Sequence, residues 1–244
     1  MRDGLIEDDF TRGVELQRAQ RYAEAVEVYR ALAKTRLTSN LACNLGVCLG
    51  ELGDWAGGAH YLELAARHQP ANAEFRRRLG ADYAEAGRTD LAEQAYREAL
   101  ALKPGDPAVR LALAGLCLSL GRYAEGWPLL AARIPLYPDV VPPVSVSFPE
   151  WRGEPLGGKS ILVWVEQGFG DQIQMCRFVN SLKALGAARV TLGCRPALAH
   201  LFSTLSGADA IVPIATGASI GVAPHDYWSR YFSLPEPLGL TLET

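Results

Sequence analysis

Residues 80–104, GADYAEAGRTDLAEQAYREALALKP, contain the pattern that decides the fold of more than half of this chain. Small, aromatic and turn-forming residues occupy fixed places in it: Gly80, Tyr83, Gly87, Ala92, Tyr96, Ala99 and Pro104. Residues of similar kinds recur 34 positions earlier, at Gly46, Leu49, Gly53, Gly58, Leu62, Ala65 and Pro70. They recur 34 positions later at Ala114, Cys117, Gly121, Gly126, Leu130 and Arg133. Self-similarity at a fixed spacing indicates an array built from one repeated supersecondary unit.

A weaker unit comes first, with Gly13, Leu16, Ala25 and Tyr29, a one-residue slip at the turn and no closing proline. In such a unit, small residues let two helices approach closely, large ones fill the gap between units, and proline ends the second helix. The pattern resembles the tetratricopeptide repeat, a helix–turn–helix unit. It predicts an α-solenoid of about four repeats over residues 5–134.

The resemblance implies that the first helix of each repeat lines a concave groove that holds a protein or peptide partner. On that geometry the groove residues are Asn40, Asn44, Glu74, Arg77, Arg78 and Leu111. The alternative is that the run at residues 76–78 and its acidic neighbours form only a solvated face.

A proline-rich linker is predicted over residues 135–152. We expect it to lie extended along the surface, because several large apolar side chains in it need cover. They are Val140, Val141, Val144, Val146, Phe148 and Trp151.

Residues 153–244 read as alternating strands and helices: strands at 160–165, 188–192 and 210–213, helices at 171–185 and 196–205, and a further segment at 226–231. This order predicts a partial Rossmann-like α/β domain with a parallel sheet. Residues 153–160, GEPLGGKS, match the phosphate-binding P-loop pattern. A P-loop follows a strand and opens a helix, whereas here a strand follows, so a plain turn is favoured.

Residues 151–156, 161–163 and above all 166–174, EQGFGDQIQ, resemble bacterial tetratricopeptide proteins fused to a GT-B glycosyltransferase domain. Those domains are similar to lipopolysaccharide heptosyltransferases. The resemblance implies that Asp171 is the general base and that substrate is bound by Glu166, Gln167, Gly168, Gly170 and Gln172. It also implies a nucleotide-sugar donor held by a second domain. Because the chain ends part-way through the first, we expect a truncated protein that lacks the donor half. The alternative for Asp171 is an acid that caps or begins a helix.

Composition excludes several classes. The net charge of −3 and the absence of a basic patch argue against nucleic-acid binding. The first residues carry no signal-peptide pattern and the apolar runs are too short to span a membrane, so we expect a cytoplasmic protein. The five cysteines form no CxxC pair and the four histidines no cluster, so neither a metal site nor a cofactor held by this chain is expected.

Three functional hypotheses remain. In the first, the repeats form a protein-interaction module and the α/β domain is the acceptor-side half of a glycosyltransferase, which glycosylates a bound protein or glycan. In the second, the chain is a non-catalytic scaffold or adaptor whose α/β domain caps the repeats. In the third, the turn at residues 168–171 binds a small ligand.

Overall fold

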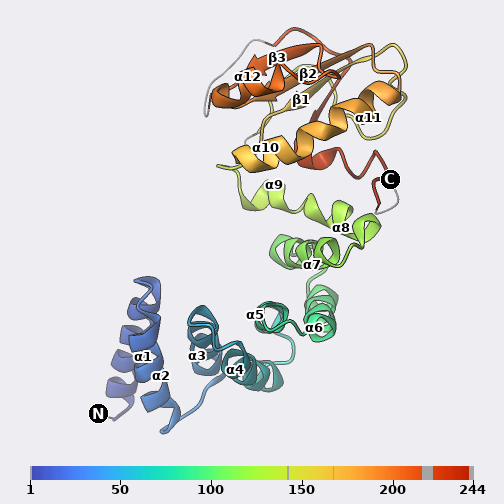
Figure 1. The fold of residues 1–244 in the computed structure, drawn as a ribbon. Coiled ribbons are helices and arrows are strands. Elements are labelled where there is room, and N and C mark those ends of the chain that lie inside the picture. The colour runs from blue at the N-terminus through green and yellow to red at the C-terminus, as the bar shows by residue number, and fades with distance from the viewer. Residues whose placement is uncertain (1, 142, 167, 216–221, 242–244) are drawn as a thin grey trace. The chain divides into compact units, whose positions relative to one another are not determined.

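The computed structural model describes residues 2–141, 143–166, 168–215 and 222–241 (Figure 1). Contacts divide the chain into two compact units, Met1–Leu116 and Cys117–Thr244, here called unit 1 and unit 2. This division lies before residue 134, the end of the repeat array in the sequence pattern. The last repeat helices belong to unit 2 because they pack against its sheet.

Unit 1 is a series of helices in which consecutive members pack side by side as hairpins (Figure 1). They are α1 (Arg2–Arg18), α2 (Tyr22–Ala33), α3 (Ser39–Glu51), α4 (Trp55–His68), α5 (Ala73–Glu85), α6 (Thr89–Leu102) and α7 (Pro107–Ser119), the last of which crosses into unit 2. In unit 1, α3 and α5 line the inner side of the arc, and α4 and α6 its outer side. The predicted helical array is confirmed.

The turns inside the hairpins explain the spacing of the glycines. Gly53, Gly87 and Gly121, each 34 residues from the next, have φ values of 84°, 72° and 73°. This left-handed conformation ends the first helix of a hairpin and favours glycine, which has no Cβ to strain. In the first hairpin the same conformation falls on Gln20, with φ 59°, which accounts for the one-residue slip.

Unit 2 begins with α8 (Tyr123–Leu130) and α9 (Arg133–Leu136) and continues into an α/β part. Its strands are β1 (Ser160–Trp164), β2 (Arg189–Cys194), β3 (Ala210–Pro213) and β4 (Tyr227–Arg230). They form a parallel sheet in the order β3-β2-β1-β4. The order of the strands therefore reverses at β1. Strands β2 and β3 follow on one side of β1, and β4 is added on its other side.

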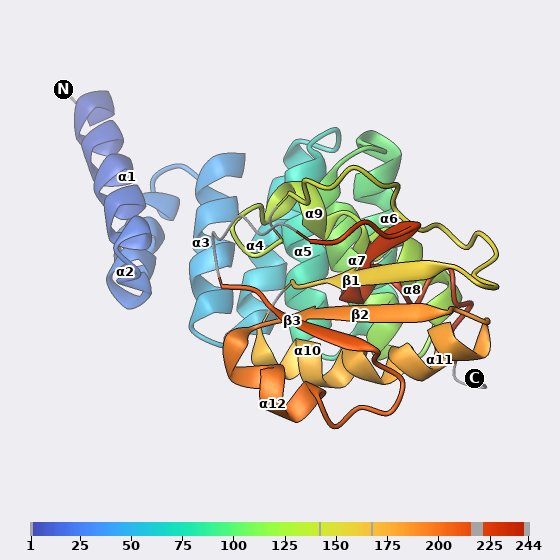
Figure 2. The ribbon, with the colours of Figure 1, turned by 90° about the horizontal axis from the view of Figure 1, so that it is seen from above.

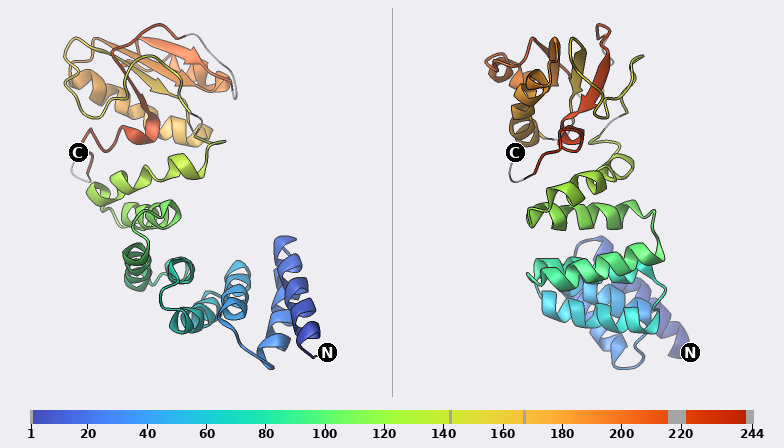
Figure 3. Two further views of the ribbon diagram at one scale, coloured as in Figure 1. Left: turned by 180° about the vertical axis from the view of Figure 1, so that it is seen from behind. Right: turned by 90° about the vertical axis from the view of Figure 1, so that its right-hand side faces the viewer.

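The two faces of the sheet are covered differently. Helices α10 (Phe169–Met175), α11 (Val179–Ala184) and α12 (Ala199–Phe202) lie on one face, where Ile161 and Val163 of β1 join the main core (Figures 2 and 3). On the other face, Val144, Val146 and Phe148 of the proline-rich segment pack against Leu162 and Trp164. The segment is laid on the sheet, as its apolar residues predicted, although Val140 remains exposed.

Two helices differ from their predictions. The one expected over residues 196–205 is a 3₁₀ turn, Pro196–Leu198, followed by α12, which ends at Phe202. The sequence predicts a single helix over residues 171–185, whereas α10 starts at Phe169 and a 3₁₀ turn, Cys176–Phe178, separates it from α11. Gly168 is the N-cap, so the helix starts two residues earlier than the first acidic residue suggests. A 3₁₀ turn between two helical segments tightens the winding locally, and it keeps Cys176, Phe178 and Val179 all in the core.

Two further findings concern the described residues. Among them, no helix combines the length and apolar character needed to cross a membrane. All five cysteines are buried free thiols. Burial raises the pKa of Cys43 to about 11 and that of Cys48 to about 12, so these thiols stay protonated and unreactive at neutral pH.

Candidate functional site

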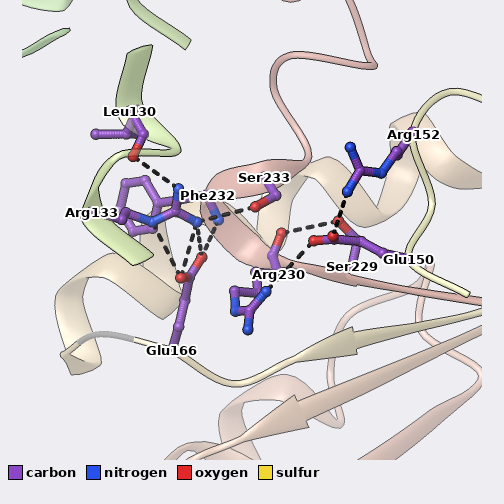
Figure 4. Close-up of polar contacts among 9 residues, drawn as sticks. All are labelled: Leu130, Arg133, Glu150, Arg152, Glu166, Ser229, Arg230, Phe232 and Ser233. Atoms are coloured by element: carbon purple, nitrogen blue, oxygen red, sulfur yellow. Dashed lines mark hydrogen bonds and ion pairs between the residues drawn. The ribbon is translucent and has the colours of Figure 1, made fainter. Parts of the chain in front are cut away.

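The first candidate site is a buried ion pair that joins the last repeat helix to the sheet. Arg133 begins α9, and Glu166 follows β1 by two residues. The Arg133 Nη2 lies 2.9 Å from Glu166 Oε1 and 3.0 Å from Oε2, and Arg133 Nε lies 3.3 Å from Oε2 (Figure 4). Only 3% of Arg133 and 2% of Glu166 are exposed. This is a bidentate arginine–carboxylate ion pair that is shielded from water.

Every remaining polar group of the pair also has a partner. The Phe232 amide donates to Glu166 Oε1 at 2.6 Å. Arg133 donates to the Leu130 carbonyl and to Ser233 Oγ, both at 3.2 Å (Figure 4). The pair therefore ties α8, α9, the end of β1 and the segment after β4 together, and a buried pair needs such complete bonding to offset its desolvation.

We call this contact between α8, α9 and the end of β1, centred on Arg133 and Glu166, the joint. Other contacts strengthen it. Trp127 of α8 packs against the core of the sheet, and its Nε1 donates to the Leu240 carbonyl at 3.2 Å. Arg230, also buried, lies 3.5 Å from Glu150 (Figure 4). Burial lowers the pKa of Arg230, while the charges of Glu166 and Glu150 oppose that shift. Helices α8 and α9 are thus built into the core of unit 2.

The second candidate site is the turn at residues 168–171, which leaves β1 at its carboxyl end. Gly168 and Gly170 are exposed, and Asp171 is half-buried. Asp171 Oδ2 accepts a hydrogen bond of 3.0 Å from the Gly168 amide, which caps the first turn of α10. The turn leaves β1 where the strand order reverses, the usual place for a ligand in an open parallel sheet.

The substrate-binding residues predicted around this turn do not all face one space. Glu166 is enclosed by Arg133 and Phe232, away from solvent. Gln172 is fully buried, where Nε2 donates to the Gly168 carbonyl and Oε1 accepts from the Arg195 amide. Gln167 lies outside the described residues. The structure leaves Gly168, Gly170 and Asp171 open to a ligand.

The third candidate site is the inner face of unit 1. Asn40 is exposed on α3, and Asn44 of the same helix donates to Tyr29 Oη. On α5, Glu74 binds both Arg77 and Arg78, with Nε to carboxylate distances of 2.7 Å in each case. Leu111 is half-buried on α7. All six residues predicted for the groove sit on α3, α5 or α7, and they do not form one cluster.

A cavity of about 320 Å³ on this face contains a residue that the sequence analysis did not single out. Asp82 of α5 lines it and is only 7% exposed. Two of its lining residues, Arg77 and Arg78, were among those predicted for the groove. The repeat pattern contains a sign of Asp82, because the positions 34 residues before and after it are Cys48 and Leu116, both buried and apolar. A carboxylate stands where the neighbouring repeats have core residues.

Nothing in the described residues points to a metal centre, since no group of three or more histidine, cysteine or carboxylate residues lies close enough together to hold an ion there. His225 is buried alone, with Nε2 2.8 Å from Thr191 Oγ1 and Nδ1 2.7 Å from the Ala223 carbonyl. Burial lowers its pKa, so it is held neutral as a core residue.

Stacked helical hairpins at a 34-residue spacing, followed by a small parallel α/β unit, define the class of this chain. Two family models, both described as tetratricopeptide repeat, match this chain over residues 43–107 and 83–143. Residues 43–143 therefore carry tetratricopeptide repeats.

Among characterised proteins, Protein FlbA of Caulobacter vibrioides is 29% identical over 199 residues, which are 77% of this chain and 32% of FlbA. The chain thus spans about a third of the length of that relative. The MamA RS-1 ArsTM double mutant is similar in structure, with a TM-score of 0.50 and 19% identity over 54% of this chain and 74% of that one. A further crystal structure of MamA gives a TM-score of 0.50 and 17% identity over 53% and 77%. At these identities the likeness concerns the fold alone.

Proposed function

We propose that this chain is an interaction scaffold: the tetratricopeptide repeats hold a segment of a partner protein, and the α/β part closes the end of the array. Repeat solenoids use their concave surface for binding. The observation that carries the proposal is that the Glu166 carboxylate is bonded within the chain. A carboxylate expected to bind a sugar acceptor is engaged instead by Arg133 and Phe232, in the contact that holds α8 and α9 to the sheet.

The inner face offers the chemistry that a protein partner needs. It presents two half-buried charged side chains, Arg77 and Arg78, which line a cavity and are both paired with Glu74. Arginine is enriched at protein interfaces because its planar head bonds carboxylates and carbonyls in pairs.

Charge reversal on the inner face tests the scaffold. The double variant Arg77→Glu/Arg78→Glu is expected to lose proteins that cross-link to the wild-type chain in cells, as measured by quantitative mass spectrometry. The matched control is Arg67→Glu on α4, since Arg67 is exposed and its ion pair with Glu63 lies within its own helix. Equal recovery of the partners by both variants contradicts a groove on α3 and α5.

A second function rests on the exposed turn at residues 168–171. As the acceptor half of a GT-B glycosyltransferase-like enzyme, this turn would hold a sugar or protein hydroxyl with Asp171 as the base, and a nucleotide-sugar would be the donor. Its support is the position of the turn at the carboxyl end of β1, next to the reversal of strand order.

Asp171→Asn separates the two functions, because asparagine keeps an oxygen for the Gly168 amide but cannot take a proton. Sugar transfer to a protein or glycan, followed with radiolabelled nucleotide-sugars on protein isolated from its host, is expected to disappear in this variant if Asp171 is the base. If wild type and variant transfer equally, or neither transfers at all, the scaffold function stands by itself.

A further inference from the structure

Asp82 occupies a position that is apolar in the neighbouring repeats. Its equivalents are Cys48, which is fully buried, and Leu116, which is 7% exposed. Burying a carboxylate without a hydrogen-bond partner costs free energy, whereas burying an apolar side chain in its place stabilises the fold. Asp82 Oδ2 is such an atom: it is buried and has no hydrogen-bond partner within the described part of the chain. The described residues give this oxygen no hydrogen bond that would offset the cost of its burial.

Two glycines make room for this carboxylate. A Cβ built on Gly50 of α3 would lie 2.9 Å from Asp82 Oδ1, and one built on Gly58 of α4 would collide with Oδ2. The repeat equivalents of Gly58 are Ala92, a buried alanine, and Gly126. A Cβ at Gly58 would also lie 2.9 Å from the Gly46 carbonyl oxygen. Without a methyl group at Gly58, the head of Asp82 fits between α3 and α4.

The cavity beside Asp82 is rich in carboxylates. We call it the Asp82 pocket, and its lining includes Glu51, Trp55, Arg77, Arg78, Asp82 and Glu85. Three carboxylates thus face two guanidinium groups, and both guanidinium groups already share Glu74. Burial, then the charges of Glu51 and Glu85, raise the pKa of Asp82 to about 7, while Arg78 opposes them. The surroundings of Asp82 therefore favour a bound positive charge.

We propose that the Asp82 pocket binds the cationic head of an arginine or lysine side chain from the partner segment that lies along α3 and α5. Asp82 supplies the buried anion, Glu51 and Glu85 the outer ones, and the half-buried ring of Trp55 an aromatic face for the cation. The inference rests on the proposed function, because the cation arrives on a bound peptide. It adds the chemical class of the side chain that the groove selects.

A small probe tests the pocket without a known partner. Nα-acetyl-arginine amide is titrated into the ¹⁵N-labelled full chain, and the neutral isostere Nα-acetyl-citrulline amide serves as the control probe. We expect the arginine probe to shift the amide resonances of Gly50 and Gly58 and the indole resonance of Trp55, and the citrulline probe to leave them in place. Equal shifts with both probes, or none with either, overturn the proposal.

Two variants keep the test independent of folding. Asp82→Asn preserves the shape of the side chain, and we expect it to weaken binding of the arginine probe roughly tenfold or more. The double variant Glu51→Gln/Glu85→Gln changes only exposed side chains and is expected to weaken binding by a smaller factor. Unchanged affinity in Asp82→Asn overturns the proposal.

The failure of this inference can be told from the failure of the scaffold. If the arginine probe binds but no cross-linked protein depends on Arg77 and Arg78, the pocket stands and the groove fails. If the cross-linked partners are retained by Asp82→Asn, the groove stands and the pocket is not what selects them.

Discussion

Glu166 in unit 2 and Asp82 in unit 1 are both buried carboxylates, and their surroundings differ in one respect. Glu166 accepts hydrogen bonds from Arg133 and from the Phe232 amide, whereas Asp82 Oδ2 accepts none from the described residues. A buried charge with all its partners inside the chain acts as a joint. One without them needs a proton or a ligand. The comparison separates a structural acid from a candidate binding acid.

The largest effect is expected from breaking the joint. Arg133→Met leaves the Glu166 charge buried and unpaired, so unit 2 should lose about 3–5 kcal/mol of stability. Amide hydrogen exchange of the β1 and β4 residues measures this in the full chain. The control is Arg152→Met, which removes an exposed partner of Glu150 and should change stability by less than about 0.5 kcal/mol. A loss below about 1 kcal/mol for Arg133→Met contradicts the joint.

Gly58→Ala probes the space that Asp82 occupies. The new methyl group collides with Asp82 Oδ2, and we expect unit 1 to lose about 1–3 kcal/mol in urea unfolding. In an Asp82→Ala background the same change should cost less, because the collision with the carboxylate is gone and only the contact with the Gly46 carbonyl oxygen, 2.9 Å from the new Cβ, is left. Gly115→Ala on α7, where a Cβ meets nothing within 4 Å, should instead stabilise the helix by roughly 0.5–1 kcal/mol. Additive effects of Gly58→Ala and Asp82→Ala contradict the close contact.

The pH dependence of stability distinguishes the two acids further. The pKa of Asp82 is raised to about 7 in the folded chain, above its value when unfolded. The folded state therefore binds the proton more tightly, and stability falls as the pH rises toward 7. Asp82→Asn removes this loss, so at pH 8 the variant should exceed the wild type by on the order of 2 kcal/mol, with a smaller difference at pH 4. Thermal unfolding at both pH values measures it, and a difference independent of pH contradicts an ionised Asp82.

Local patterns in the sequence predicted much of this fold. The 34-residue spacing located the hairpins because three of their turns, at Gly53, Gly87 and Gly121, have a glycine in a left-handed conformation. The apolar runs located β1 to β3 within two residues. What local pattern could not supply was pairing: Glu166 meets Arg133 across 33 positions, and nothing in the stretch at residues 166–174 indicates it. Asp82 was visible as a break in the repeat, but only its burial shows that the break matters.

Asp171 is an intermediate case between the joint and the pocket, and the smallest effect is expected there. It is half-buried, and its carboxylate accepts a hydrogen bond from the Gly168 amide. If it serves only as a cap, Asp171→Ala should destabilise unit 2 by about 1 kcal/mol, and Asp54→Ala, which removes the cap on the Gly57 amide, should cost unit 1 a similar amount. Hydrogen exchange of the first turns of α10 and α4 compares the two directly. An increase in stability for Asp171→Ala, with the expected loss for Asp54→Ala, contradicts a purely structural cap. Such an increase is typical of groups kept for function at the expense of stability. It would classify Asp171 with Asp82, the candidate binding acid, and not with Glu166, the structural acid.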